Sequence, residues 1–352
     1  MDLEPEGVFA KNHDETGRTL LIPYYPVIAS SRATDRWFDY EIGSSGWTAV
    51  RVGPGKEDGA APRLYLIKLP EADEVVELEL LLEEHVRRMS EKDANGSLLE
   101  VSDDLYIAIH GYAWGDSMAW SPDGKRLAFV AALDGPSADV YMYDTQTDEL
   151  IRLTDGSNQP YLNGWSPDGH WVVHQEVVNI WLGQLGIEYD PIALWAASAI
   201  GDGSVHVLAL ENPITIMAWT SPTQFLTGLY SEAYYDTYRL QLVDMFSGVV
   251  STYYPGYFHA WAVDPVSGTV AFVTSSLPSH PENPQDEGLY LVSPTNRTPM
   301  LLGFTEPDDG NKSGLVSSVE WSPILDMFEV ATRGGEVYRV TPEGLMTRCE
   351  DC

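Results

Sequence analysis

Apolar and polar residues alternate in short segments along most of the chain, and turn-forming residues separate these segments. Within residues 114–155 the pattern predicts four strands, namely a short one ending at Trp120 and the segments 125–131, 139–144 and 150–154. Alternation with a period of two is typical of strands that bury one face. The intervening Ser121–Gly124 is a tight-turn sequence, because Pro fixes φ, Asp hydrogen-bonds nearby backbone and Gly tolerates positive φ. Four antiparallel strands are therefore expected here.

The unit repeats. Trp-Ser-Pro-Asp-Gly occurs at 120–124 and again at 165–169, and weaker copies follow Trp219, Trp261 and Trp321. The spacings between the five Trp anchors are 45, 54, 42 and 60 residues. Units of this size match four-stranded propeller blades with loops of variable length. We therefore interpret Trp120, Trp165, Trp219, Trp261 and Trp321 as structural blade anchors.

The same alternation extends over the rest of the chain. It predicts strands at 36–42, 47–52, 63–69 and 75–80; 160–165, 170–177, 191–200 and 204–210; 214–219, 224–230, 237–244 and 249–254; 257–263, 269–275, 288–292 and 299–303; and 316–321, 327–332, 336–340 and 345–349. The sequence thus predicts an all-β, six-bladed propeller of four-stranded antiparallel blades. Seven blades remain an alternative, because residues 1–35 and 83–113 are ambiguous.

Three further segments complete the predicted organisation. Residues 1–35 are an N-terminal extension in which 19–25 forms an edge strand that helps to close the ring. Apolar residues at helical spacing predict a short helical insertion near 81–95. A single propeller domain occupies 36–349, and 350–352 form a C-terminal tail.

The phrase W-S-P-D-G-K-x-L-A-F, followed by D-V-Y-x-Y-D and by L-x-x-L-T, resembles the TolB-like propeller repeat (WD40-like, PD40-type). The same repeat occurs in the propeller domain of prolyl-oligopeptidase-like peptidases. Residues 120–154 carry the resemblance most closely, and the later repeats match it in part. The resemblance implies a bacterial, mostly extracytoplasmic protein with a binding or scaffold role. It assigns no functional residue, because the motif is a turn and packing signature.

Charge narrows the classes of partner. The chain carries 20 Lys+Arg against 53 Asp+Glu, which gives a net charge of −33. Such a polyanion does not bind nucleic acid through a basic surface and is repelled by anionic membranes. No apolar segment approaches the ~20 residues that span a bilayer, so no membrane insertion is expected. The acidic start of the chain is not a signal peptide, which leaves a cytoplasmic location open beside the extracytoplasmic one.

Candidate binding residues gather in the loops. In a propeller the loops between strands two and three share one face with the connections between blades, and here that face carries nearly all the insertions. The loops 177–190 and 230–238 supply aromatic residues with polar tips, which suit recognition of a protein, peptide or glycan. The candidates are Trp181, Tyr189, Tyr230, Tyr234, Tyr235 and Tyr238, together with His259 on an inner strand. The alternative is that these loops pack on one another.

Enzymatic constellations are weak. There is no Gly-x-Ser-x-Gly elbow and no His-Glu-x-x-His. A metal site would need His110, His174 and His259 to converge, and we predict no metal, no cofactor and no catalytic residue. Cys349 and Cys352 form at most half of a metal site.

The sequence therefore favours a non-catalytic propeller that binds a ligand or protein, or acts as a scaffold, through its long-loop face. Two alternatives stay open. One is a propeller enzyme, a polysaccharide lyase or a glycoside or peptide hydrolase, that acts at the channel mouth. The other is a structural subunit of a larger assembly, which a large apolar patch on one side would support.

Overall fold

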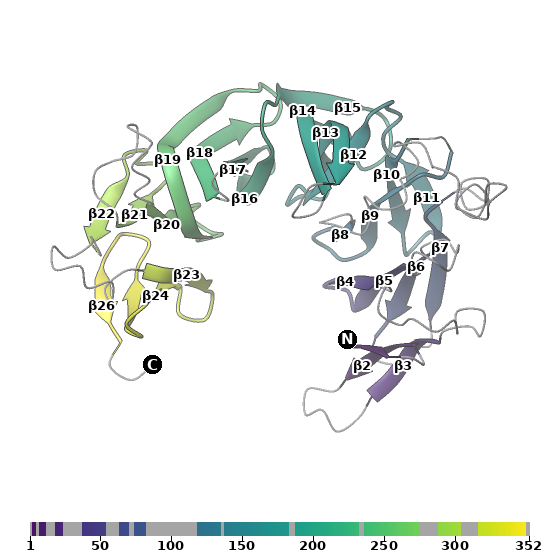
Figure 1. The fold of residues 1–352 in the computed structure, drawn as a ribbon, viewed down its shortest axis with the longest axis horizontal. Helices are drawn as coiled ribbons and strands as arrows, with labels where there is room; N and C mark the ends of the chain where they lie inside the picture. Colours follow the sequence, from purple (N-terminus) through teal and green to yellow (C-terminus); the bar gives the residue numbers. More distant parts are fainter. Residues whose placement is uncertain are drawn as a thin grey trace. The chain divides into compact units, whose positions relative to one another are not determined.

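The computed structural model describes residues 2–4, 7–11, 18–23, 37–53, 63–69, 74–81, 118–134, 137–182, 187–231, 236–274, 288–303 and 316–349. All regular elements in these ranges are β-strands, labelled in chain order in Figure 1. No helix that could span a membrane occurs among them. The chain divides into two compact units, residues 1–206 and residues 207–352.

The first unit holds a three-stranded sheet and three four-stranded sheets. The three-stranded sheet is β1 (Asp2–Glu4), β2 (Gly7–Lys11) and β3 (Arg18–Pro23). Blade one is β4 (Trp37–Ile42), β5 (Trp47–Gly53), β6 (Arg63–Lys68) and β7 (Val75–Glu79). Blade two is β8 (Met118–Trp120), β9 (Arg126–Ala131), β10 (Asp139–Asp144) and β11 (Glu149–Arg152). Blade three is β12 (Gln159–Trp165), β13 (Trp171–Leu182), β14 (Ile187–Ser198) and β15 (Ser204–Ala209), whose last residues enter the second unit.

Trp120 and Trp165 each join their blade to the one before it. The indole N–H of Trp120 donates to the Glu41 carbonyl oxygen of blade one at 3.0 Å. The indole N–H of Trp165 donates in the same way to Ala119 of blade two at 2.8 Å. The anchors therefore pack and hydrogen-bond between neighbouring blades, which explains why a large aromatic residue with one donor recurs at this position.

The Ser-Pro-Asp-Gly turns are stabilised from within and from the neighbouring turn. In blade two the Ser121 hydroxyl donates to the Asp123 carboxylate at 2.6 Å and accepts the Arg126 backbone N–H at 3.0 Å. Gly124 has φ +68° and lies so close to the blade-one turn at Ser45 that no Cβ would fit. We call the end of each sheet that carries these turns the turn end, and the opposite end the loop end.

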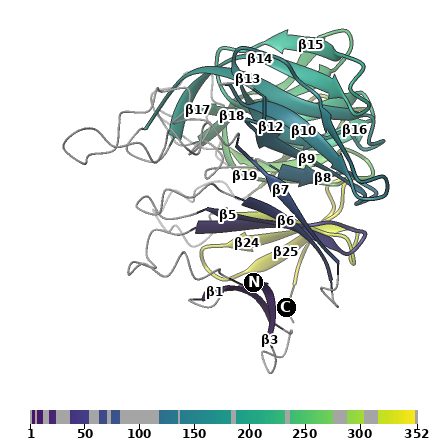
Figure 2. The same ribbon diagram turned by 90° about the vertical axis from the view of Figure 1, so that its right-hand side faces the viewer.

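The second unit contains one seven-stranded and one four-stranded sheet. The seven strands are β16 (Ile214–Ser221), β17 (Gln224–Ser231), β18 (Asp236–Asp244), β19 (Val250–Val263), β20 (Val270–Thr274), β21 (Leu289–Val292) and β22 (Met300–Gly303). The last sheet is β23 (Val316–Ser322), β24 (Met327–Thr332), β25 (Val337–Val340) and β26 (Met346–Arg348). Figure 2 shows β24 and β25 of this sheet side by side in yellow.

Buried aromatic residues fill the cores of the second unit. Each anchor Trp of this unit pairs with a Phe on the next strand of the chain: Trp219 with Phe225, Trp261 with Phe272 and Trp321 with Phe328. All three Phe side chains are fully buried. Burial of aromatic residues of this size is a dominant stabilising contribution in a β-sheet core.

The all-β class and the four-stranded antiparallel blade are confirmed, and the predicted strands agree with the observed ones to within one or two residues in most places. Three predictions are wrong. Residues 177–182 and 187–190 are not loop residues, because they belong to β13 and β14, in which Trp181 pairs with Glu188. Within the predicted loop 230–238, residues 230–231 and 236–238 belong to β17 and β18, in which Tyr230 pairs with Thr237. Residues 249–254 and 257–263 are not separate strands but one strand, β19, which pairs with β18 and then with β20.

Other predictions at the ends of the chain have different outcomes. The predicted strand at 19–25 exists as β3, which pairs with β2 in a hairpin that the alternation did not predict. The expected helix near 81–95 lies outside the described residues, apart from Leu81, which forms an isolated bridge with Ala132. The six-blade count, the ring-closing role of residues 19–25, the single domain over 36–349 and the tail at 350–352 remain predictions.

Candidate functional site

The predicted aromatic residues occupy both units. Trp181 and Tyr189 lie on the hairpin of β13 and β14, and the ring of Tyr189 lies 5.2 Å from that of Tyr161 on β12. In the second unit Tyr230 is on β17 and Tyr238 on β18. Tyr234 and Tyr235 lie outside the described residues. Tyr189 therefore contacts an aromatic residue of its own blade, while a shared aromatic rim remains a prediction.

The predicted histidines are separated as well. His259 lies on β19 of the second unit, His174 is buried on β13 of the first, and His110 is outside the described residues. No group of three or more metal-ligating side chains occurs within the ranges that the structure covers.

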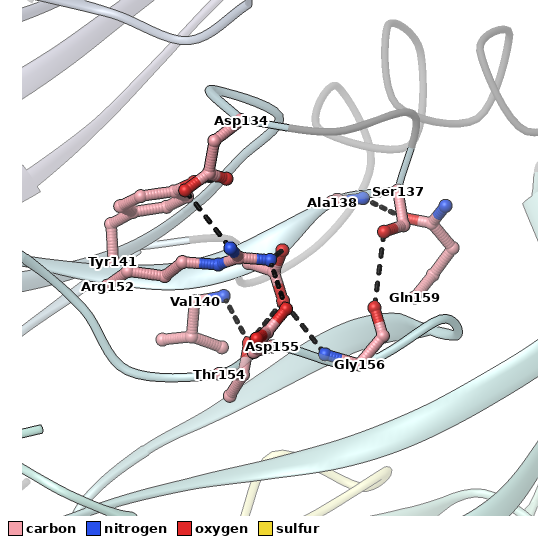
Figure 3. Close-up of polar contacts among 11 residues, drawn as sticks. Asp134, Ser137, Ala138, Val140, Tyr141, Arg152, Thr154, Asp155, Gly156 and Gln159 are labelled. Carbon is pink, nitrogen blue, oxygen red and sulfur yellow. Dashed lines mark hydrogen bonds and ion pairs between the residues drawn. The ribbon is translucent and has the colours of Figure 1, made fainter. Parts of the chain in front are cut away.

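A charged cluster at the loop end of blade two is the most elaborate polar arrangement in the first unit (Figure 3). Its centre is the guanidinium of Arg152, at the end of β11. Arg152 Nη2 lies 2.7 Å from Asp139 Oδ2 and 2.8 Å from Asp155 Oδ1, and Nη1 lies 3.1 Å from Asp134 Oδ2. Three carboxylates thus surround one cation.

The three carboxylates differ strongly in exposure. The Asp139 side chain is 2% exposed, that of Asp134 49% and that of Asp155 88%. Asp139 Oδ1 also accepts hydrogen bonds from the Thr154 hydroxyl at 2.8 Å and from the Gly156 N–H at 3.4 Å. Asp139 therefore holds the cluster inside the protein, whereas Asp134 and Asp155 present negative charge to solvent.

Neighbouring hydrogen bonds fix the two segments that carry these acids. The Tyr141 hydroxyl donates to Asp134 Oδ1 at 2.8 Å, and the Ser137 hydroxyl donates to the Gly156 carbonyl oxygen at 3.2 Å. The backbone N–H of Ala138 donates to Gln159 Oε1 at 2.9 Å. The segment between β9 and β10 is therefore tied to the segment that leads from blade two into blade three (Figure 3).

Burial sets the ionisation of this cluster. It raises the pKa of the Asp139 carboxyl above its ordinary value, although the hydrogen bonds from Thr154 and Arg152 act in the opposite direction. Burial and then the hydrogen bond to Asp134 raise the pKa of the Tyr141 phenol, which keeps it protonated as a donor. With Tyr141 neutral, three ionised carboxylates and one guanidinium leave a local charge of −2.

A second polar chain continues into blade three. The Asn158 amide donates to Glu176 Oε1 at 2.5 Å, and the Trp195 indole N–H donates to Glu176 Oε2 at 2.8 Å. The ring of His206 packs edge-on against Trp195, with centroids 4.9 Å apart. These contacts extend the polar surface of the loop end with an aromatic and an acidic group.

This cluster is not evident from the sequence alone. Asp139 begins the D-V-Y segment and Thr154 ends the L-x-x-L-T segment that carry the family resemblance, and the resemblance implies only a turn and packing role for that motif. Arg152, two residues before Thr154, reaches Asp139 because β10 and β11 are paired.

Comparison with known proteins gives limited likeness. No family model matches the chain. The uncharacterized peptidase YuxL of Bacillus subtilis (strain 168) is 37% identical over 67 residues, which are 18% of this chain. The match covers 10% of that peptidase, so the chain spans only a small part of the length of this relative.

The solved structures with similar folds include TolB of Acinetobacter baumannii (13% identity, 83% of this chain, 58% of TolB, TM-score 0.38). They also include Pyrococcus horikoshii acylaminoacyl peptidase (11%, 91% and 47%, TM-score 0.48). A third is the β-propeller domain of the Trilobed protease from Pyrococcus furiosus (11%, 92% and 85%, TM-score 0.46). TolB and peptidase propellers are the two groups that the repeat of residues 120–154 resembles. The likeness does not extend to function.

Proposed function

We propose that this chain is a non-catalytic binding module that takes a Lys- or Arg-containing segment of a protein or peptide at the loop end of blade two. One observation carries the proposal: Asp134 and Asp155 are exposed carboxylates held in place around Arg152. A prearranged site binds more tightly than a flexible one because less conformational entropy is lost on binding. The whole-chain charge of −33 also steers cationic partners toward the protein.

The aromatic residues predicted in the loops fit the same role. Tyr189 is partly exposed beside Tyr161 on blade three, the blade next to the charged cluster. Aromatic and Arg or Lys side chains form cation–π contacts within about 6 Å. In this proposal Trp181 extends the binding face of blade three, and Tyr230, Tyr234, Tyr235, Tyr238 and His259 are candidate binding residues of the second unit. Glycans are the alternative ligand class.

The setting of the protein is proposed on one further observation. Cys349 is disulfide-bonded, and disulfides persist mainly in oxidising compartments. This supports an extracytoplasmic location, which also agrees with the resemblance to TolB-like propellers.

The test is peptide-array binding with two matched double variants. Asp134→Asn/Asp155→Asn removes the exposed acids of the cluster with almost no change of shape. Glu149→Gln/Asp202→Asn removes two exposed acids from the turn end of the same unit. We expect Lys- and Arg-rich peptides to bind the wild type and the second variant, and to bind the first variant at least about tenfold more weakly, since two charge contacts are lost.

Other results would contradict the proposal. Equal loss in both variants would show attraction by net charge alone. Binding that is confined to neutral peptides or to glycans, and unchanged in both variants, would place the ligand elsewhere on the protein. Urea unfolding of each variant shows whether it retains the wild-type fold.

A second candidate function is the propeller of a peptidase, which the 37% identity to part of the YuxL peptidase favours. The 352 residues contain no Gly-x-Ser-x-Gly, so in this case the catalytic groups would be supplied by other residues or by another chain. Hydrolysis of fluorogenic peptide substrates by the purified chain, abolished by a covalent serine-hydrolase inhibitor, would support a peptidase activity of the chain itself.

A further inference from the structure

Large apolar side chains stand exposed at the turn end of the second unit. We name them the apolar turn surface; they are Phe246, Val249, Val266, Met300, Ile324 and Leu345. Ile324 is 93% exposed and Val266 is 88% exposed, so neither side chain contributes appreciably to the core. Each residue belongs to a turn or to the strand residue that directly follows one.

These residues replace polar ones in the repeat. In the first unit the residues after Ser-Pro are Asp123 and Gly124, which suit a turn because Asp hydrogen-bonds locally and Gly adopts positive φ. In the last blade, Ile324 and Leu325 follow Ser322-Pro323 instead. An exposed Ile improves neither the turn nor the core and increases the risk of aggregation. Folding therefore gives no reason for its presence.

Three of the turns that carry this surface adjoin one another. The Met300 side chain lies directly against Gly344, next to Leu345, where a Cβ would collide with it. Gly268, two residues after Val266, contacts Pro294 in the turn that precedes Met300. The turns of 264–268, 293–299 and 341–345 thus form a continuous surface within the second unit rather than isolated exposed residues.

Acidic groups border the surface. Asp326 and Glu343 are exposed and lie within two residues of Ile324 and Leu345 in the chain, and Arg297 is the one basic residue in the described turns of this end. A second copy of the chain would bring −33 against −33, and such like-charge contact opposes association. From the apolar tips, their continuity and this border, we infer a docking surface for a protein partner whose apolar contact residues are flanked by Lys or Arg.

This inference concerns the second unit, whereas the charged cluster belongs to the first, and it does not depend on the function proposed there. Together the two surfaces would allow the chain to connect two partners. Apolar contact of this kind places the binding energy in a few residues at the centre of the interface, with charge around the rim.

The test uses a triple variant, Val266→Ser/Ile324→Ser/Leu345→Ser, and a matched control, Val75→Ser/Leu150→Ser/Ile192→Ser, which removes three exposed apolar residues of the first unit. The probe is an 18-residue helical peptide with a Leu face flanked by Lys, labelled for fluorescence anisotropy at 0.15 M NaCl. A peptide of the same composition in scrambled order, without an apolar face, has the same charge. We expect the wild type and the control to bind the first peptide, and the triple variant to bind it at least about tenfold more weakly.

Hydrogen exchange of the complex should show protection at the turns of residues 264–268, 323–326 and 341–345. Equal binding by the triple variant, equal binding of the scrambled peptide, or no binding of the Leu/Lys peptide would each overturn the inference. Dimerisation of the wild type that the triple variant loses, measured by sedimentation, would also overturn it, because the occupant would then be a second copy. The residues altered in the triple variant are 68% to 93% exposed, so its urea midpoint should equal that of the wild type. The urea midpoint of each variant is measured, which keeps loss of folding distinguishable from loss of binding.

Discussion

His174 should make the stability of the first unit depend on pH. Its ring is buried on β13, where it pairs with Leu162 on β12 and Trp195 on β14, and neither ring nitrogen makes a hydrogen bond of normal geometry. Burial lowers the pKa of His174 to about 4, against small opposing effects of the Gln175 backbone and Glu176. The perturbation we choose is His174→Leu, which keeps the volume roughly constant and removes the titrating group.

The magnitude follows from the two pKa values. An unfolded histidine takes up its proton near pH 6.5, whereas the folded one does so near pH 4. The stability of the wild type is therefore unaffected above pH 6.5 and is lost progressively as the pH falls toward 4, because the unfolded state binds the extra proton. The difference amounts to about 2 kcal/mol at pH 5 and at most about 3 kcal/mol at pH 4.

The assay is urea unfolding followed by Trp fluorescence at pH 7.5, 6.5, 5.5 and 5. At pH 7.5 His174→Leu should be as stable as the wild type or more stable, since two buried nitrogens without partners are removed. The advantage of the variant should then grow by about 2 kcal/mol down to pH 5. The matched control is His206→Leu, which removes an exposed histidine from the same sheet and shows how much of the change results from the loss of any histidine there.

The result that would refute this reasoning is a difference between His174→Leu and the wild type that does not change between pH 7.5 and 5. It would mean that the folded protein hydrates or pairs the His174 ring, so that the ring takes up its proton as readily as in the unfolded chain. A strongly destabilised variant at pH 7.5 would instead contradict the assignment of the ring as an unsatisfied core residue.

Three further outcomes are expected. Trp165→Ala should lower the free energy of unfolding in urea by about 3–5 kcal/mol, because a buried aromatic residue is lost. Trp165→Phe should lower it by about 1 kcal/mol, because mainly the hydrogen bond to Ala119 is lost. A decrease below about 1 kcal/mol for Trp165→Ala would contradict the anchor role. Asp139→Ala should destabilise by about 2–3 kcal/mol because it removes the buried partner of the partly exposed Arg152, and an unchanged unfolding midpoint would count against the cluster. Hydrogen bonds from the Gln224 side chain and from Ser247 lower the pKa of Asp244 to about 2, so the Asp244 carboxyl should titrate near pH 2 in an NMR titration. The stabilisation that this carboxylate contributes should be complete above pH 3.8 and lost as the pH falls toward 2. A titration midpoint near pH 3.8 would argue against these bonds.

The blade pattern was predictable because it is local. Strict alternation, a tight turn and an anchor Trp lie within a short stretch of sequence, and together they define the strands of a blade. The strands around Trp120 and Trp165 lie where the sequence predicted them. The continuity of β19 was not predictable in this way. Pro255 and Gly256 are typical of a break between strands, yet pairing with β18 and then β20 keeps the chain extended through them.

The candidate site was less accessible from sequence, for a physical reason. The charge of Arg152 is balanced by Asp134, which lies 18 residues away in the chain, and by Asp139 on the neighbouring strand. Residue type alone favours the aromatic side chains of the predicted loops as binding residues, because such side chains are easily recognised in a sequence. A chain with 53 acidic residues gives no local signal for which few of them surround a cation, since that depends on the pairing of β10 with β11 and on burial.

The unbroken course of β19 has a consequence for how this chain can be rearranged. Repeat proteins usually tolerate the loss, duplication or permutation of one unit, because each unit ends at a connection that can be cut. Here the backbone of β19 ends one four-stranded repeat and begins the next within the same sheet, so a cut between Tyr254 and Tyr257 would sever hydrogen-bonded ladders on both sides. New termini at residues 210–213, which connect β15 to β16 outside any ladder, should be tolerated. The β16–β22 sheet should therefore tolerate deletion or permutation only as a whole.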